Sequence, residues 1–269
     1  SNNTAVGKNA LLANTTGTQN VAVGALVLDA HTTGGENTAI GYGSLSASTT
    51  ASNNVAVGST ALLTNTTGAS NVAVGRRALF SNTTAANNTA IGNQALLSNT
   101  TGDKNVSVGA TSLDANTTGA SNTAIGFESL TANVAGSKSV GVGTGSLSDQ
   151  NPSSATDMFN TAVGFNAGAS VTTGTSNTTV GGLSLDANTT GSSNTALGRS
   201  AMTANTTGGD NTSVGRGSMS SSTTGSNNAA LGFNALASNT TASNNTAVGS
   251  AALSANTTGA NNTSVGMQS

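Results

Sequence analysis

Residues 54–70 read Asn-Val-Ala-Val-Gly-Ser-Thr-Ala-Leu-Leu-Thr-Asn-Thr-Thr-Gly-Ala-Ser, and variants of this 17-residue unit fill the chain. Sixteen copies follow one another with this period, and one step, from Ser139 to Asn160, is longer by four residues. The copies begin at Asn3, Asn20, Asn37, Asn54, Asn71, Asn88, Asn105, Asn122, Ser139, Asn160, Asn177, Asn194, Asn211, Asn228, Asn245 and Asn262. A fixed period indicates structural units that stack on their neighbours. We therefore expect residues 1–269 to form a single array of about 16 coils, each built from one 17-residue unit, and we number the positions within each copy from one to seventeen.

Positions one to four alternate in character and predict a short strand. Asn37-Thr38-Ala39-Ile40 is an example, with β-branched residues at every second position. This pattern is typical of a pleated surface that is buried on at least one face. Position five is glycine in every copy, which predicts a backbone bend without a side chain. These bend glycines are Gly7, Gly24, Gly41, Gly58, Gly75, Gly92, Gly109, Gly126, Gly143, Gly164, Gly181, Gly198, Gly215, Gly232, Gly249 and Gly266.

The rest of each copy predicts a second apolar segment and a chain reversal. Positions eight and nine pair a small residue with a large aliphatic one, as in Ala61-Leu62. Positions twelve to fifteen often read Asn-Thr-Thr-Gly, a cluster of turn-forming residues. Position fifteen is alanine at Ala51, Ala85 and Ala242, so glycine is preferred there and not required. A 17-residue unit is too short for a helical hairpin, so we predict an all-β fold, a parallel β-solenoid or β-roll with 17-residue coils.

The composition limits the core and the function classes. Charged residues make up 6% of the chain, aromatic residues make up 2%, and cysteine is absent. Each coil offers roughly three or four apolar side chains, whose burial barely offsets the entropy lost by ordering a whole coil. We therefore expect a partner chain, held by apolar columns at positions two, four, eight and nine. A net charge of −2 leaves no basic patch for nucleic acid, and no apolar run spans a bilayer, so a membrane would be reached only through parts outside this segment.

Residues 150–159 interrupt the period. Gln150 to Phe159 replace the usual turn, add four residues and include Pro152, the one proline of the chain. We interpret this segment as a longer surface loop. A functional loop carrying Asp157, Met158 and Phe159 is the alternative, because solenoids often place insertions on a binding face.

The Thr-Ala-Ile-Gly element, as at residues 38–41 and 89–92, resembles the head repeats of trimeric autotransporter adhesins and the repeats of phage tail-fibre shafts. The resemblance covers essentially the whole chain. It implies a left-handed parallel β-roll and a homotrimer with a shared apolar interior. The adhesin head repeat is usually shorter, and the additional length here falls in the Asn-Thr-Thr-Gly turn.

No residue pattern predicts catalysis, a cofactor or a metal site. The single histidine, His31, replaces the usual asparagine at position twelve, and we expect a solvated turn residue. Asp29, Asp114 and Asp186 share position ten but lie several coils apart, whereas a calcium ladder needs an aspartate in each successive coil. The recurrent glycines form no phosphate-binding loop, because no Gly-Lys-Ser/Thr sequence follows them and no helix is predicted on which phosphates could dock.

Two polar columns predict ladders on the turn side. Asparagine at positions one and twelve can form amide ladders between stacked coils. Position twelve also offers Asn-Thr-Thr acceptor sequences for N-glycosylation. These are Asn14, Asn65, Asn82, Asn99, Asn116, Asn188, Asn205, Asn239 and Asn256.

From these features we expect a non-enzymatic structural or adhesive segment of an extracellular fibre, at a cell surface or on a virion. Its partner would be itself, with a host or surface receptor as a further partner. Two alternatives stay open. One is a subunit that polymerises end to end into a filament, and the other is an ice-binding solenoid that uses the paired threonines of positions thirteen and fourteen.

Overall fold

The computed structural model describes residues 2–269; Ser1, the first residue of the predicted array, lies outside the described residues. The chain is an all-β parallel β-solenoid of about 15 turns with 17-residue coils. Residues 2–269 contain no helix, and hence none with the length and hydropathy of a bilayer-spanning segment. Two compact units are present, Ser1–Ala135 and Gly136–Ser269.

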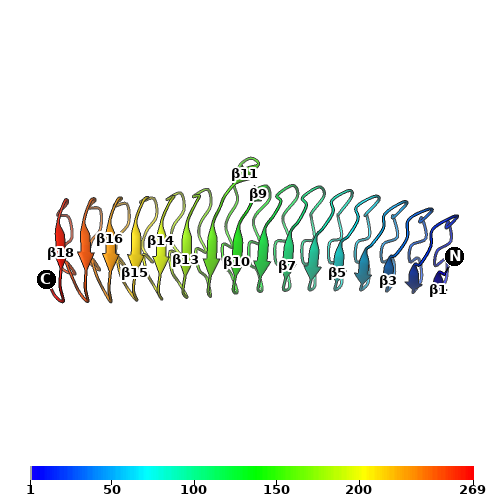
Figure 1. Cartoon of the computed structure of the whole chain (residues 1–269), viewed down its shortest axis with the longest axis horizontal. Helices are drawn as coiled ribbons and strands as arrows, with labels where there is room; N and C mark the ends of the chain where they lie inside the picture. Colours follow the sequence, from blue (N-terminus) through cyan, green and yellow to red (C-terminus); the bar gives the residue numbers. More distant parts are fainter. Residues whose placement is uncertain (1) are drawn as a thin grey trace. The chain divides into compact units, whose positions relative to one another are not determined.

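The first unit contains eight strands of three residues, which lie side by side in chain order (Figure 1). They are β1 (Thr4–Val6), β2 (Val21–Val23), β3 (Thr38–Ile40), β4 (Val55–Val57), β5 (Val72–Val74), β6 (Thr89–Ile91), β7 (Val106–Val108) and β8 (Thr123–Ile125). Each pairs in parallel with the next, and equivalent residues of successive copies are paired, as in Val55↔Val72. The sequence period therefore equals the strand register, because equivalent residues stack directly on one another.

The second unit continues the same pattern around the insertion. Its main sheet contains β10 (Val140–Val142), β12 (Thr161–Val163), β13 (Thr178–Val180), β14 (Thr195–Leu197), β15 (Thr212–Val214), β16 (Ala229–Leu231), β17 (Thr246–Val248) and β18 (Thr263–Val265). β10 pairs with β12 across the insertion, as in Val140↔Thr161, so the four added residues leave the ladder in register. Within the insertion, β11 (Thr156–Asp157) pairs in parallel with β9 (Gly136–Ser137), which precedes β10, and the two make a second sheet.

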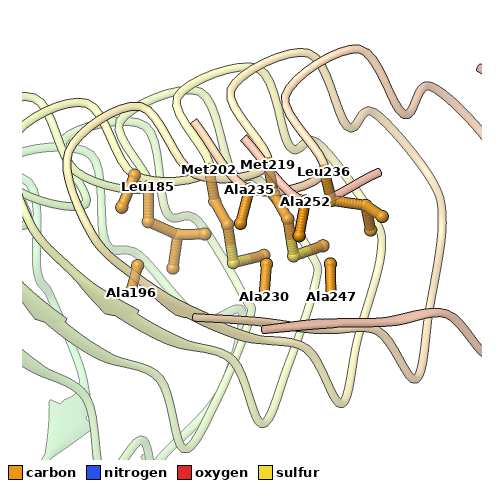
Figure 2. Close-up of a cluster of buried hydrophobic side chains, with 10 residues drawn as sticks. Leu185, Ala196, Met202, Met219, Ala230, Ala235, Leu236, Ala247 and Ala252 are labelled. Carbon is orange, nitrogen blue, oxygen red and sulfur yellow. The ribbon is translucent and has the colours of Figure 1, made fainter. Parts of the chain in front are cut away.

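The core is a narrow column built from positions three, eight and nine. In one coil Ala56, Ala61 and Leu62 are all completely buried. Figure 2 shows the same arrangement in the second unit, where Met202 and Met219 take the place of leucine beside alanines such as Ala230. In most coils one large side chain at position nine fills the interior, and its burial contributes about 1.5 to 3 kcal/mol. The coil that begins at Asn160 has Gly168 there and buries Val171 instead.

The structure corrects the expectation that apolar columns at positions two, four, eight and nine together hold a partner chain. Positions eight and nine are buried inside their own coil, so they cannot reach a second chain. Positions two and four point outward, as Val55 and Val57 do on either side of buried Ala56. The alternation of a strand puts position three on the opposite face, and the narrow interior accepts its alanine.

Where position three is polar, the core keeps a hydrogen bond. The Ser107 and Ser112 hydroxyl oxygens lie 2.5 Å apart, and Ser213 pairs with Ser218 in the same way. In every copy with Ser or Thr at position three, position eight is serine. The pairing satisfies hydroxyl groups that burial would otherwise leave without a partner.

Many non-glycine residues adopt a positive φ, at positions seven, nine and seventeen. Leu62 at position nine has φ 51°, Thr60 at position seven has φ 56° and Asn53 at position seventeen has φ 61°. Such a conformation is disfavoured for L-residues. The hydrogen bonds between coils hold it in place, since Leu62 donates its N–H to Ala78 O of the next coil at 3.0 Å.

Candidate interaction surfaces

The outer surface of the main sheet, which we call the sheet face, carries the side chains of positions two and four. Position four is Val, Ile or Leu in every copy. Within the first unit Ile40 and Ile91 are 39% and 40% exposed, and within the second Val180 and Leu231 are 40% and 42% exposed. Position two is Thr, Val or Ala. Each unit therefore presents an unbroken aliphatic row to solvent.

The sixteen bend glycines border the sheet face. All have a φ between 118° and 144°, a region that strongly favours glycine. A Cβ on Gly58 would lie 2.5 Å from Gly75 O and 2.7 Å from Gly75 C of the next coil. The bends therefore stack backbone against backbone. At position fifteen a Cβ would also meet the next coil, as on Gly68, where it would overlap Ala85 O, but no φ lies in the positive region. The difference in φ agrees with the alanines found at position fifteen.

Position one forms a buried asparagine ladder. Asn71 donates its backbone N–H to Asn54 Oδ1 at 2.9 Å and its Nδ2 to Ala85 O at 2.9 Å. Its own Oδ1 accepts the backbone N–H of Asn88 at 3.0 Å. Each side chain thus satisfies the backbone amide of the next copy and the turn of its own copy, which explains why asparagine recurs at position one.

Position twelve forms a second ladder, and this bears on glycosylation. Asn99 donates its Nδ2 to Asn82 Oδ1 and to Gly102 O, both at 3.0 Å. Seven of the acceptor asparagines are completely buried: Asn65, Asn82, Asn99, Asn116, Asn188, Asn205 and Asn239. Asn14 and Asn256 are half-buried. A buried Nδ2 that donates inside the stack is not accessible for a glycan in the folded chain.

His31 lies in this second ladder, and the expectation of a solvated turn residue is wrong. The imidazole is completely buried. Its Nε2 lies 2.8 Å from Gly34 O, and its Nδ1 lies 3.2 Å from Ser48 Oγ. The ring replaces the hydrogen bonds that asparagine makes elsewhere, because position twelve faces the interior of the stack.

No known protein-family model, curated protein or solved structure matches this chain.

The threonines of positions thirteen and fourteen form two columns beside the asparagine ladder. At position thirteen the hydroxyl donates to the backbone of the next coil, as Thr83 Oγ1 does to Thr100 O at 3.1 Å. At position fourteen every threonine is exposed. These are Thr16, Thr33, Thr50, Thr67, Thr84, Thr101 and Thr118 in the first unit and Thr173, Thr190, Thr207, Thr224, Thr241 and Thr258 in the second.

The acidic residues of position ten are held by their neighbours within the stack. Asp29 accepts a hydrogen bond from Ser46 Oγ, Asp114 from Thr131 Oγ1 and Asp186 from Thr203 Oγ1, at 2.5 to 2.6 Å. In the described part of the chain no three His, Cys, Asp or Glu side chains lie close enough to hold a metal, and no pocket is present.

The insertion is anchored by the three residues that its sequence made candidates. Asp157 forms an ion pair with Lys138 at 2.7 Å, and the Lys138 Nζ lies 5.2 Å from the centre of the Phe159 ring. Met158 is completely buried. Met158 therefore anchors the segment by packing, whereas Asp157 and Phe159 stay exposed and contact Lys138 at the surface.

Proposed function

We propose that this array is a structural and adhesive segment of an extracellular fibre, in which copies of the chain associate through the sheet face. The observation that carries the proposal is the aliphatic row at position four, which every coil presents to solvent. Contiguous exposed apolar surface on a folded protein marks an interaction site. The resemblance to adhesin heads and tail-fibre shafts supports a homotrimer and a location on a cell surface or virion.

The energetics of one coil support association. Most coils bury a single Leu or Met and two small residues, while a Val, Ile or Leu at position four stays partly in water. Covering this side chain would add on the order of 1 kcal/mol per coil. The same gain in successive coils produces a strong interface from a weak repeated contact. The role is mechanical, since backbone ladders along the stack resist bending.

The mass of the purified protein in solution tests the proposal. Analytical ultracentrifugation should give three times the chain mass of 25.6 kDa. The double variant Val57→Lys and Val74→Lys places two charges on the sheet face and should shift the protein toward monomer. The matched control, Thr67→Lys and Thr84→Lys, adds the same charges to the same two coils at exposed position fourteen and should leave the mass unchanged.

A wild-type mass of one chain at all concentrations would refute association. A mass of two chains would indicate a dimer instead of the trimer, with the sheet face still as the interface. If both double variants dissociate equally, the interface does not lie at position four.

An ice-binding solenoid is a second candidate, favoured by the regular threonine columns. In addition to the position-fourteen column, position two carries threonine in four successive coils of the second unit, at Thr161, Thr178, Thr195 and Thr212. Regular hydroxyl and methyl groups on a parallel sheet can order water. A thermal-hysteresis assay without any effect on ice growth would eliminate this candidate. End-to-end polymerisation is the remaining alternative, and electron microscopy would distinguish long filaments from particles of uniform length.

A further inference from the structure

Position six, directly after the bend glycine, concentrates the residues used most often in recognition. The chain has thirteen aromatic and basic residues, five Phe, one Tyr and seven Lys or Arg, so an even spread would place about one at each repeat position. Position six holds eight of them: Lys8, Tyr42, Arg76, Phe127, Phe165, Arg199, Arg216 and Phe233. Its four aromatic side chains are 47% to 59% exposed. We call this column the position-six edge.

The densest part of the edge lies in the second unit. Phe165, Gly182, Arg199, Arg216 and Phe233 occupy position six of five successive coils. The strands of these coils pair in register, so neighbouring members are about 4.8 Å apart along the stack. Two adjacent arginines thus lie between two exposed rings.

Both guanidinium groups are available to a ligand. Arg199 and Arg216 are exposed, and the ion pair found among residues 2–269 is Lys138 with Asp157, elsewhere in the unit. Position seven of the same five coils carries no acidic residue. The Arg216 guanidinium carbon lies 5.4 Å from the centre of the Phe233 ring, a contact that orients the group without neutralising it.

The chemistry of this row fits an acidic sugar chain. Guanidinium groups bind carboxylate or sulfate through paired hydrogen bonds. Exposed aromatic rings stack on the apolar face of a pyranose ring, and the intermediate Gly182 leaves a gap beside Phe165. Nucleic acid fits less well, because the affinity for a phosphate backbone depends on many cationic contacts and the row offers two.

We propose that the row of Phe165, Arg199, Arg216 and Phe233 binds an acidic polysaccharide that carries sulfate or carboxylate groups. The row belongs to the position-six edge and not to the sheet face, so the proposal does not depend on self-association. It gives the fibre a ligand class that the repeat pattern alone does not specify.

Binding of a defined heparin oligosaccharide by the full chain, measured by isothermal titration calorimetry at physiological salt, tests the proposal. The double variant Arg199→Gln and Arg216→Gln should weaken binding at least tenfold, since each residue supplies charge-assisted hydrogen bonds.

The matched control is Arg76→Gln and Arg77→Gln in the first unit. It removes the same charge, but the neighbouring copies of position six there are Ser59 and Asn93 and provide no flanking ring. Phe80, whose ring centre lies 4.7 Å from the Arg77 guanidinium carbon, is at position ten and not on the position-six edge.

The outcomes are distinct. The site is supported if the Arg199 and Arg216 variant loses heparin affinity and the control variant retains it. A loss of heparin affinity in Phe233→Ala further supports stacking of a sugar ring on this side chain. An equal loss of heparin affinity in both double variants would indicate non-specific electrostatic attraction and overturn the proposal. No heparin binding by the wild type would also overturn it, as would equally tight binding of single-stranded DNA of similar length. Circular dichroism of each variant establishes that the fold is intact.

Discussion

Replacement of Gly58 by alanine should destabilise the array much more than the same replacement of Gly43. The φ of Gly58 is +134°, and a Cβ there would lie 2.5 Å from Gly75 O and 2.7 Å from Gly75 C. The backbone conformation costs about 1 to 3 kcal/mol for an L-residue. The overlap with main-chain atoms that cannot rotate away adds about 1 to 3 kcal/mol. The expected loss in the free energy of unfolding is therefore about 2 to 6 kcal/mol.

Gly43 provides the matched control. It has a φ of +63°, and its Cβ would lie 3.5 Å from Leu63 Cδ1 and 3.6 Å from Thr60 Cγ2, which are ordinary contacts. Other copies of position seven carry Asn, Gln or Arg at a similar φ. Gly43→Ala should cost about 1 to 2 kcal/mol, the cost of the left-handed backbone alone.

Native-state hydrogen exchange suits this comparison because coils of a repeat array can open locally. The reporter is the Gly75 N–H, which donates to Val57 O at 2.8 Å in the coil that is changed. Its opening free energy should fall by several kcal/mol in Gly58→Ala. The stacked-bend explanation would be refuted if Gly58→Ala and Gly43→Ala lowered stability equally, because the inter-coil contact would then contribute nothing.

Substitutions at three sites test the polar interior. Asn71→Ala should lower the free energy of unfolding by about 1 to 3 kcal/mol, because it leaves the buried Asn88 N–H without its acceptor and removes a donor from Ala85 O. Urea unfolding measures this loss, and an unchanged midpoint would contradict the prediction. His31→Leu should lower the free energy of unfolding by about 1 to 3 kcal/mol, because it removes the partner of the buried Ser48 hydroxyl and a donor to Gly34 O. His31→Asn should stay within about 1 kcal/mol of the wild type. Equal effects of the two variants would show that the ladder does not stabilise this position. In a double-mutant cycle, Ser107→Ala and Ser112→Ala should show a coupling energy of about 1 kcal/mol, and additive effects would contradict the buried hydroxyl pair.

The predicted trimer, receptor and extracellular location remain predictions that rest on resemblance and on the exposed sheet face. The predicted solenoid with 17-residue coils is present, with the glycine bend at φ 118° to 144° in every copy. The asparagine ladders of positions one and twelve were also predictable. A column of identical side chains at a fixed period has few other ways to satisfy its amide groups.

The sequence by itself determined the period, and with it the parallel register, because stacked coils of equal length place equivalent residues beside one another. It could not determine which strand positions face inward, since Val55, Ala56 and Val57 are all acceptable in a core. The tertiary structure decided this through the width of the coil. The interior is so narrow that it accepts only a small residue such as alanine at position three, and the larger residues of positions two and four face outward. It also placed His31 inside the stack and held leucines such as Leu62 at positive φ. Both depend on hydrogen bonds to residues of the adjacent coil, which local sequence preferences do not contain.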